Sequence, residues 1–453
     1  MSVLNYFEWV NLLAGGLIII TGFFSGYYLF QEREYPVTVK TIPVFFVPGT
    51  VMLFLTLWGP EALVYILSAI NITLFVLLVW PPGLRFKLSR QMPETRLDER
   101  DIMFSRRLLE KGSERYKAYY TRHPDHQAPD DHFRNKPGLL SRNSRYYEPL
   151  SFAAADALFG TVETLAKDIT GEVSENKNSY DAERITLFLK NFARKMGALD
   201  AGVTLMKPVH YYHTGGRNYN YGQPIQPNHK YGLAFTVEME SEMIGAGPKG
   251  PTVMESAHQY LESGKIAVAL AGTIRNLGYD ARAHIDGHYL VVCPMVARDA
   301  GLGDIGRMGL LMTPQHGPRV RIGVVTTDLP LIPDPAIPDP VMTDFCYRCR
   351  KCADNCPANA IPTGPPEKIG NVTRWKINQE ACYTFWTIAG TDCGRCIAVC
   401  PYAHKNNLFY RVIRKTLRRS FLINRLALPL DQYFYGSKPK VKDPPDWIGG
   451  NVL

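Results

Sequence analysis

The sequence predicts an α+β protein in which three transmembrane helices precede a mixed α/β domain and a smaller cysteine-rich domain. Three observations support this fold class. Three long, uncharged apolar runs occur in the N-terminal part of the chain, helical and strand patterns are mixed from about residue 151 onward, and cysteines cluster near the C-terminal end. A net charge of +9 with 46% hydrophobic residues is typical of a globular protein attached to a membrane segment.

The three apolar runs span residues 10–30, 41–59 and 62–80. Each is about long enough to cross a bilayer core of roughly 30 Å as a helix. One such run alone is also compatible with a buried core helix, but three in succession predict a membrane anchor over residues 1–83. No basic segment and no twin-arginine pair precedes the first run, so we do not expect a cleaved export signal.

Basic residues fall on one side of this predicted anchor. Arg33 and Lys40 lie in the first loop, and Arg85, Lys87 and Arg90 follow the third run, whereas the N-terminal residues and the second loop contain neither Lys nor Arg. Cytoplasmic flanks of membrane helices carry the excess of such residues. We therefore expect a multi-pass protein of the cell inner membrane with the rest of the chain on the cytoplasmic face.

The remainder of the chain divides into four regions by composition and pattern. Residues 84–150 are basic, with little apolar periodicity, and we expect a connector without chemistry of its own. Helices are predicted at 181–196 and 256–277, and strands at 201–206, 234–239 and 289–292. These elements predict an α/β layer domain at 151–340, followed by the cysteine-rich domain at 341–405 and a basic, then proline-rich, tail at 406–453 that packs on the body.

Cysteine spacing is the most specific signal in the sequence. The run C-x2-C-x2-C-x3-C-P at residues 346–357 is the pattern that binds [4Fe–4S] clusters, with the fourth cysteine on a second cluster. A shorter second run at 393–401 lacks one position, which Cys382 can supply. The two predicted ligand sets are Cys346, Cys349, Cys352 and Cys400, and Cys356, Cys382, Cys393 and Cys396. Paired zinc ribbons are the alternative, but they are built from separated C-x2-C pairs.

Two neighbouring clusters conduct electrons, so the reaction itself must take place in the preceding domain. The string G-x-G-x-x-G occurs at residues 301–306, but it lacks a βαβ setting, and we do not expect a dinucleotide site. Such a glycine-rich loop permits either close approach to a large flat cofactor or a tight turn. Cys293 lies outside the cysteine cluster and is interpreted as a small buried hydrophobic residue.

Several segments together resemble the cobalamin-dependent reductive dehalogenases. They are Asp299-Ala-Gly-Leu-Gly-Asp-Ile-Gly-Arg-Met-Gly-Leu-Leu-Met-Thr-Pro314, Gly317-Pro-Arg-Val-Arg321 and Thr327-Asp-Leu-Pro-Leu331, followed by the cysteine runs. The resemblance covers roughly residues 150–405. It implies a nitroreductase-like domain that binds a corrinoid, a bacterial-ferredoxin-like domain with two [4Fe–4S] clusters, and reductive removal of halide from an organohalide by Co(I) cobalamin.

The resemblance also implies which residues do the chemistry. Tyr260, four residues after Ser256, matches the family's proton donor, and Arg319 and Arg321 lie about sixty residues further on, with Arg319 nearer the expected distance. A carbon–hydrogen bond requires a proton, and a nearby cation lowers the pKa of a phenol, which is ordinarily about 10. By the alternative interpretation, Tyr260 is a packed helix residue.

Further site residues follow from the same resemblance. Asp286 and His288 occupy positions where the family often has an asparagine near the substrate. Asp286-Gly-His288-Tyr-Leu-Val291 departs from the D-x-H-x-x-G cobalt-ligand motif in its last residue, so His288 is not expected on cobalt. The expected cofactor-binding residues are Ser256, Gly303, Met308, Gly309, Leu310 and Thr313.

The first loop of the anchor contains Glu32-Arg-Glu34, which resembles the Glu-x-Glu motif of the separate three-helix anchors of respiratory dehalogenases. Two other functions are compatible with parts of the sequence. An epoxyqueuosine reductase acts on a tRNA base and would not need membrane helices. A non-catalytic electron-transfer module would leave residues 150–340 unexplained. The expected partners are a small organohalide, the membrane, and a quinol, ferredoxin or flavodoxin as electron donor. We expect no nucleic-acid partner, and a homo-oligomer is left open.

Overall fold

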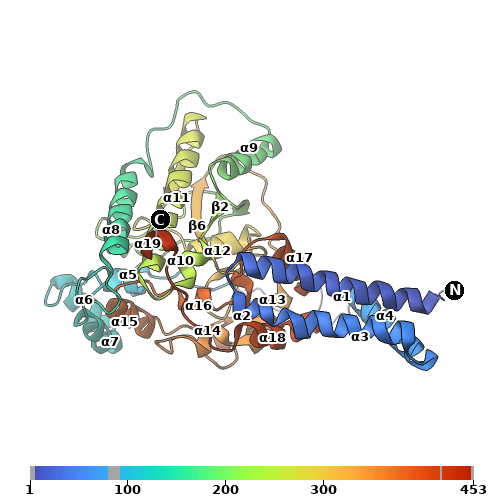
Figure 1. Cartoon of the computed structure of the whole chain (residues 1–453). Coiled ribbons are helices and arrows are strands. Elements are labelled where there is room, and N and C mark those ends of the chain that lie inside the picture. The colour runs from blue at the N-terminus through green and yellow to red at the C-terminus, as the bar shows by residue number, and fades with distance from the viewer. Residues whose placement is uncertain (1–5, 80–91, 419–420, 450–453) are drawn as a thin grey trace. The chain divides into compact units, whose positions relative to one another are not determined.

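The computed structural model describes the backbone of residues 6–79, 92–418 and 421–449, and the order of its elements can be followed by colour in Figure 1. The chain forms two compact units. The helical unit comprises residues 1–87, 340–345 and 406–439. The mixed unit comprises residues 88–339, 346–405 and 440–453. Arg85, Lys87 and Arg90, on which the predicted orientation partly depends, lie outside the described residues.

The helical unit contains two stretches long and apolar enough to cross a membrane, Tyr6–Gln31 and Tyr35–Trp58. The first is helix α1, and the second consists of α2 (Tyr35–Val39), a π-helical turn (Ile42–Phe46) and α3 (Val47–Trp58). The third apolar run forms α4 (Glu61–Val79). Its apolar part among the described residues, Glu61–Leu77, is too short to count as a membrane-spanning helix. A third crossing therefore stays a prediction. The unit also contains α17 (Leu408–Leu417) and α18 (Phe421–Tyr435).

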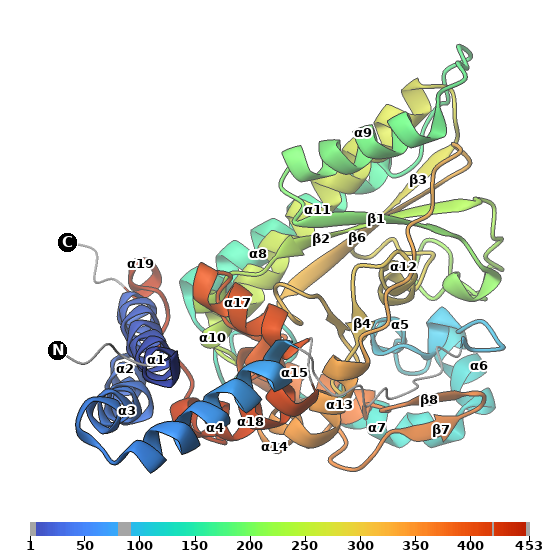
Figure 2. The ribbon, with the colours of Figure 1, turned by 90° about the vertical axis from the view of Figure 1, so that its right-hand side faces the viewer.

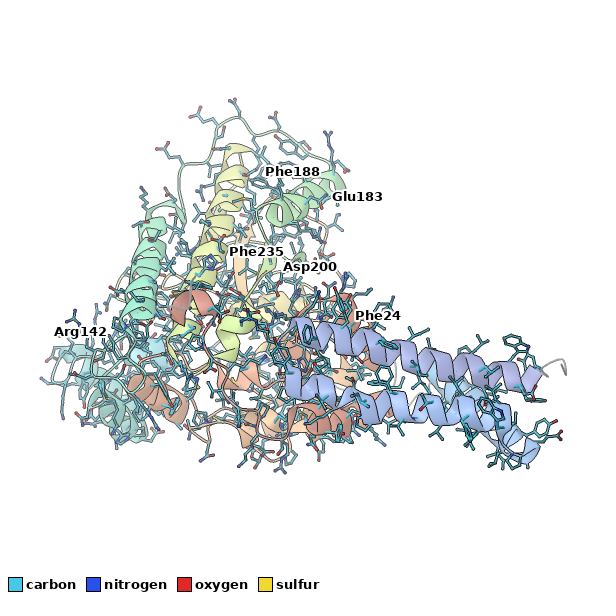
Figure 3. The ribbon with its side chains drawn as sticks, viewed as in Figure 1. Phe24, Arg142, Glu183, Phe188, Asp200 and Phe235 are labelled. Carbon is cyan, nitrogen blue, oxygen red and sulfur yellow. The ribbon has the colours of Figure 1, made fainter. Side chains whose placement is uncertain are left out.

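Large apolar side chains of this unit point outward, whereas polar and small residues lie between its helices. Large apolar residues project outward, such as Phe24 on α1, which is 56% exposed (Figure 3). Asn11, fully buried, donates to the carbonyl oxygen of Val64 at 3.0 Å. Gly15 and Gly49 let α1 and α3 approach closely, because a Cβ at Gly49 would lie 2.6 Å from Ile19 Cγ1. Polar contacts inside and small residues between helices are the packing that lipid-embedded helices use.

The mixed unit is built on a four-stranded antiparallel sheet, shown in Figure 2. Its strands, in spatial order, are β1 (Asp200–Leu205), β2 (Tyr231–Glu238), β6 (Val320–Thr327) and β3 (Ala281–His284). Helices α8 (Pro149–Thr164), α9 (Ala182–Lys195) and α11 (Gly250–Asn276) cover one face, and α12 (Cys293–Asp299) covers the other. Both faces of the sheet are therefore buried.

The sheet has a hydrophobic core on each face, because side chains along each strand alternate between the two faces. Leu233 and Phe235 of β2 join the core beneath α9 and α11, and Figure 3 shows Phe235 inside the unit. Ala234, between them, joins the core beneath α12, which also contains Cys293 as a buried apolar residue. Successive side chains of a strand point to opposite faces of the sheet. The predicted mixture of helices and sheet is confirmed; α9 lies within one residue of its predicted bounds, and α11 begins six residues before its predicted start.

One predicted strand is wrong, and two strands of the four-stranded sheet were not predicted. In the segment 289–292 Val291 makes an isolated bridge to Tyr211, and the chain then enters α12. The reason is local: a turn with Gly287 at φ +78° precedes the segment and Pro294 begins the helix. The unpredicted strands are β3 and β6, and β6 pairs with both β2 and β3.

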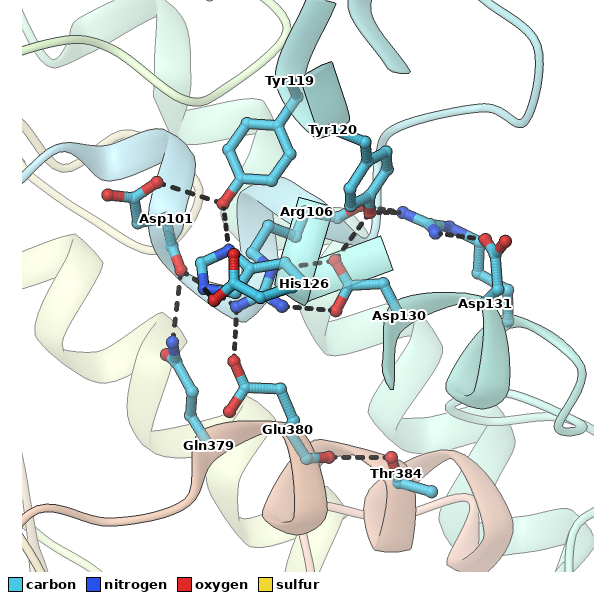
Figure 4. Close-up of polar contacts among 12 residues, drawn as sticks. Asp101, Arg106, Tyr119, Tyr120, His126, Asp130, Asp131, Gln379, Glu380 and Thr384 are labelled. Carbon is cyan, nitrogen blue, oxygen red and sulfur yellow. Dashed lines mark hydrogen bonds and ion pairs between the residues drawn. The ribbon is translucent and has the colours of Figure 1, made fainter. Parts of the chain in front are cut away.

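Residues 99–134 form short helices around a buried polar network, shown in Figure 4. Arg106, on α5 (Met103–Arg106), donates to Asp130 of α7 (Pro124–Arg134) and to Glu380 of α15 (Gln379–Ala389), each with a nitrogen–oxygen distance of 2.6 Å. Tyr120, on α6 (Glu114–Arg122), also donates to Asp130, at 2.6 Å. Hydrogen-bonded charged and phenolic side chains share the interior of this segment with a few apolar ones, so its apolar periodicity is weak.

The cysteine-rich region contains short helices joined by tight turns. Besides α15 its elements are α13 (Pro340–Cys349), α14 (Lys351–Asp354), α16 (Arg395–Ala398) and a two-stranded ribbon of β7 (Glu367–Ile369) and β8 (Val372–Arg374). Arg350 and Gly394, just before α14 and α16, both have left-handed backbone conformations, with φ of 55° and 61°. The two cysteine runs thus share a local geometry.

Candidate active site and cluster-binding domain

Tyr260 and Arg321 lie against each other in the mixed unit. Tyr260 is on α11 and Arg321 is the second residue of β6. The guanidinium carbon of Arg321 lies 4.6 Å from the centroid of the Tyr260 ring. Ser256 is one helical turn before Tyr260, on the same face of α11, and its Oγ accepts a hydrogen bond of 2.6 Å from Arg321 Nη2. The structure therefore brings together three of the predicted residues.

Asp392 completes this group, although the sequence did not single it out. Its Oδ2 accepts a hydrogen bond of 2.8 Å from Arg321 Nη2 and another from Ser256 Oγ. It directly precedes Cys393 but is 136 positions from Ser256, so only the folded chain joins them. Asp392 Oδ1 and Arg321 Nε are buried without a hydrogen-bond partner among the described residues. Buried polar atoms are rarely left unsatisfied, so this group has capacity for a ligand.

The electrostatics keep the Tyr260 phenol protonated. Burial raises its pKa to about 12, and Asp286 and Asp392 add to that increase, whereas Arg321 opposes it. The sequence predicts that a nearby cation lowers the pKa of Tyr260, but it does not predict the larger rise that burial causes. Burial would lower the pKa of Arg321, but interactions with Tyr260 and Asp392 outweigh it and the net pKa is raised. A neutral phenol thus lies beside a permanent cation.

Asp286 and His288 have different surroundings. Asp286 follows β3 and is close enough to Arg321 for the two charges to interact; burial raises its pKa, and Arg217 and Arg321 counteract part of the rise. His288 Nε2 instead lies 3.1 Å from Glu163 Oε2, and its ring stacks on Tyr219. Asp286 is therefore part of the Tyr260 group, while the contacts of His288 are with Glu163 and Tyr219.

Tyr289 is a second tyrosine near the group that sequence reasoning did not single out. Its pKa is raised well above the usual value, first by burial and then by the charge of Asp286. Tyr289 lies in the segment 289–292, which was predicted to be a strand. A strand pattern does not show that this tyrosine lies near Tyr260 and Asp286. A hypothetical anionic Tyr289 is thus disfavoured, and this phenol too is held neutral.

The sequence leaves open which of the two arginines assists Tyr260; in the structure Arg321 lies against the Tyr260 ring, and Arg319 bonds other groups. Arg319 is buried, and its Nε donates to the carbonyl oxygen of Ala403 at 2.9 Å. Its Nη1 donates to Glu238 Oε1 at 2.7 Å and to the carbonyl oxygen of Met239. Arg319 therefore joins β2 to the end of the cysteine-rich region, and sequence distance alone could not separate it from Arg321.

The glycine-rich segment packs closely against the chain itself. A Cβ at Gly303 would lie 2.3 Å from the carbonyl oxygen of Met312, and one at Gly309, where φ is +74°, would lie 2.7 Å from Ile377 Cδ1. Thr313 is buried and its Oγ1 donates to the carbonyl oxygen of Gly317 at 3.1 Å. These glycines are needed for the chain's own packing, whatever else the segment binds.

Met308 and Leu310, the other two predicted cofactor-binding residues of this segment, differ in exposure. Met308 is 3% exposed, and Leu310 is partly exposed next to β5 (Leu311–Met312). Together with Gly303, Gly309 and Thr313 they lie in one continuous stretch of chain. Their part in binding a cofactor stays a prediction.

Arg307, in the middle of this segment, is a buried cation beside the first cysteine run. It donates to the carbonyl oxygens of Cys346 at 2.9 Å and Tyr347 at 2.8 Å, and its guanidinium stacks on Trp375. Burial lowers its pKa, whereas charges on Cys352 and Cys346 would raise it. A cation placed there stabilises negative charge on those sulfur atoms. A lone arginine between glycines gave no such signal in the sequence.

The thiols form two electrostatic groups. The pKa of Cys400 is raised by burial and by interactions with Cys346, Cys349 and Cys352. The pKa of Cys396 is raised by burial and by interactions with Cys393, Cys382 and Cys356. Each group combines cysteines from both runs.

Among the described residues, no three His, Cys, Asp or Glu side chains converge closely enough to hold a single metal ion. In a cubane cluster each thiolate instead binds a separate iron, so its sulfur ligands stand further apart than the ligands of one ion. The chemistry of the donor set, eight thiols in two groups of four, fits two [4Fe–4S] clusters.

Comparison with known proteins agrees with this class of iron–sulfur protein. Residues 345–404 match the family model of the 4Fe-4S dicluster domain. A tetrachloroethene reductive dehalogenase of Sulfurospirillum multivorans is 32% identical over 215 residues, which are 46% of this chain and 42% of that protein. An epoxyqueuosine reductase of Staphylococcus aureus is 34% identical over 92 residues, 20% of each chain.

Among solved structures, a catabolic reductive dehalogenase in complex with 3-bromo-4-hydroxybenzoic acid superimposes with a TM-score of 0.60 and 25% identity. The match covers 65% of this chain and 43% of that one. The chain thus spans less than half the length of the curated relatives it matches. The resemblance to the reductive dehalogenases is confirmed over the matched part, and the fold is theirs.

Proposed function

We propose that this protein removes halide reductively from a small organohalide, with electrons from two [4Fe–4S] clusters and a proton from Tyr260. The observation that carries the proposal is the group of Tyr260, Arg321, Ser256 and Asp392, in which a neutral phenol contacts a cation next to a cluster-ligand cysteine. The similarity to reductive dehalogenases over part of the chain supports it. The net reaction takes up two electrons and one proton and releases halide.

Tyr260 and Arg321 would divide the acid chemistry between them. The phenol is protonated at neutral pH because its pKa is raised to about 12, so it can donate to carbon. Donation leaves a phenolate, whose charge Arg321 stabilises at a ring distance of 4.6 Å. Asp392 and Ser256 hold the guanidinium in place through Nη2, and Asp286 offers a further polar contact for the substrate.

A corrinoid is the cofactor that we propose for this site, held by the predicted residues of the 303–313 segment and Ser256. The unsatisfied Asp392 Oδ1 and Arg321 Nε fit a site that remains to be filled by substrate or cofactor. When bound, the corrinoid would supply the reduced cobalt centre that takes electrons from the clusters and breaks the carbon–halogen bond. The nitroreductase-like character of the binding domain belongs to the same proposal.

For the clusters we propose the two ligand sets predicted from the spacing. One is Cys346, Cys349, Cys352 and Cys400; the other is Cys356, Cys382, Cys393 and Cys396. The electrostatic grouping of the thiols supports this assignment. Because Asp392 adjoins Cys393, the second cluster would be the one that delivers electrons to the Tyr260 group.

The helical unit is proposed as a multi-pass membrane anchor with the mixed unit on the cytoplasmic side. Outward apolar residues and the close glycine contacts between α1 and α3 support membrane insertion. The electron donor would be a quinol in that membrane or a ferredoxin or flavodoxin in solution.

The test is anaerobic reconstitution of the full chain with iron, sulfide and cobalamin, followed by a halide-release assay with chemically reduced dye as donor. We expect about eight irons per chain, bound cobalt, and release of one halide for every two electrons consumed. In deuterated water the product should carry one deuterium on the carbon that lost halide. Protein that binds iron and cobalt fully but releases no halide from any of a panel of chloro- and bromo-arenes and alkenes would overturn the proposal.

A further inference from the structure

The C-terminal helices α17 and α18 of the helical unit are hydrogen-bonded at both ends to residues on either side of α2. Asn407, which caps α17, donates from Nδ2 to Glu32 Oε1 at 2.8 Å. At the end of α18, the carbonyl oxygens of Tyr433 and Phe434 accept hydrogen bonds from Lys40 Nζ at 2.7 and 2.9 Å. Glu32 directly follows the first apolar stretch and Lys40 is near the start of the second. If those stretches cross a membrane, both ends of the α17–α18 pair lie at its surface.

Each of the two helices exposes apolar side chains four residues apart. On α17 these are Leu408 and Val412, 55% and 56% exposed, and on α18 they are Leu426 and Leu430, 56% and 47% exposed. Residues at i and i+4 share one face of a helix. The opposite side of α17 faces inward, where Tyr410 is buried and its hydroxyl bonds that of Tyr435. The exposed stripes are therefore not turned toward the unit's own interior.

Positive charge accompanies these stripes. Between Leu408 and Tyr435 the sequence contains six Lys and Arg residues and one acidic residue, Asp431. Arg411, Lys415 and Arg425 are exposed next to the apolar side chains. Long basic side chains can keep their charge in the headgroup layer while their methylene groups lie along apolar surface. Apolar residues flanked by basic ones are typical of helices that lie in a membrane interface.

We propose that the exposed face of α17 and α18, defined by Leu408, Arg411, Val412, Lys415, Arg425, Leu426 and Leu430, binds the surface of a membrane that contains anionic phospholipid. The inference rests on the proposed membrane anchor and is independent of the reaction. A lipid surface is favoured over a protein partner because the two hydrogen-bonded ends hold the helices beside the ends of the apolar stretches. The excess of basic residues complements anionic headgroups.

The experiment places a photoreactive p-benzoylphenylalanine at single positions of the full chain in nanodiscs of mixed phosphatidylcholine and phosphatidylglycerol. The test position is Val412. Phe54 on α3, 58% exposed, reports on the anchor itself, and Phe188 on α9, 50% exposed, is the matched control in the mixed unit. We expect lipid adducts at positions 412 and 54 and none at 188, with phosphatidylglycerol enriched over phosphatidylcholine at 412.

A second variant tests the role of charge. Arg411→Gln with Lys415→Gln should lower the phosphatidylglycerol enrichment at position 412, by about fivefold for each charge removed, and leave the adduct at 54 unchanged. Lipid adducts at 54 but none at 412, or a protein crosslink at 412, would overturn the inference and leave the anchor standing. Adducts at neither position would overturn both, and equal labelling by the two lipids at 412 would overturn the preference for anionic lipid.

Discussion

Two arginines of the mixed unit, Arg106 and Arg321, differ in how fully the hydrogen-bonding groups of each arginine and its carboxylate partner are satisfied. Around Arg106 the guanidinium bonds two carboxylates at 2.6 Å, and the side chains of Arg106 and Asp130 are fully buried (Figure 4). Around Arg321 the contacts are similar, but Arg321 Nε and Asp392 Oδ1 are left without a hydrogen-bond partner among the described residues. The first arrangement is typical of structural stabilisation, and the second of a site that receives a ligand.

The largest expected effect distinguishes the surroundings of the two arginines by their tyrosines. Tyr260→Phe should lower the rate of halide release by about 10²- to 10⁴-fold, because a positioned general acid contributes that much. Tyr119→Phe removes a hydroxyl that bonds Asp101 and His126 in the polar network around Arg106, and should leave the rate within about twofold. Steady-state halide release with both variants, loaded equally with iron and cobalt, checks this. If the two variants lost the same amount of activity, both hydroxyl groups would affect the rate by stabilising the folded structure, and Tyr260 would not be a proton donor.

The second effect is on stability. Arg106→Met leaves Asp130 and Glu380 without their cation, and should destabilise the protein by about 3–5 kcal/mol, as breaking a buried ion pair does. Arg100→Met breaks a pair with Asp98 of the same 2.6 Å length but partly exposed, and should cost no more than about 1 kcal/mol. Denaturant unfolding followed by far-UV circular dichroism compares them. An Arg106 variant as stable as the Arg100 variant would contradict the structural role.

A third change tests whether Asp392 positions Arg321. Asp392→Asn keeps the shape but removes the charge, and should cost about 1.5–3 kcal/mol of transition-state stabilisation, the worth of a hydrogen bond to a charged group. That corresponds to roughly 10- to 150-fold in rate. Glu238→Gln, which alters the partner of Arg319 instead, is the matched control and should change the rate little. If Glu238→Gln lowered the rate more than Asp392→Asn does, Arg319 and not Arg321 would be the arginine that assists Tyr260.

The smallest effect is on pH dependence. The pKa of Tyr260 is raised from about 10 to about 12, so the protonated, donating form persists as pH rises through 10 and is lost only near 12. Halide release should therefore show no alkaline decline near pH 10 that Tyr260 causes. A decline there in the wild type would place the phenol in water, with an ordinary pKa.

The chemistry of the clusters could be predicted from the sequence because four cysteines at short spacing are a local pattern. Tyr260 and Ser256 were found through a family spacing along one helix. Asp392 and Arg307 could not be found that way, since their partners are distant in sequence and each is a single polar residue beside a glycine or a cysteine. Sequence distance also could not show which of Arg319 and Arg321 lies beside Tyr260, because that depends on the contacts each arginine makes in the folded chain.

The same reasoning explains the errors in the fold. Helices α9 and α11 have long apolar stripes that sequence patterns reveal. β6 is buried on both faces, so it lacks alternation, while residues 289–292 have strand-like composition but are followed by Pro294 at the start of a helix. In residues 99–134 polar side chains share the interior with a few apolar ones, so little apolar periodicity can be detected.

We propose that the organohalide binds at the group around Tyr260 and Arg321, where Arg321 Nε and Asp392 Oδ1 have no hydrogen-bond partner among the described residues. The most direct measurement is the anomalous diffraction of bromine in crystals of the oxidised, corrinoid-loaded protein soaked with a bromophenol, because oxidised protein cannot turn the ligand over. We expect a bromine peak beside the Tyr260 side chain, with the ligand in reach of Arg321. A fully occupied peak elsewhere in the mixed unit, with none beside Tyr260, would contradict it.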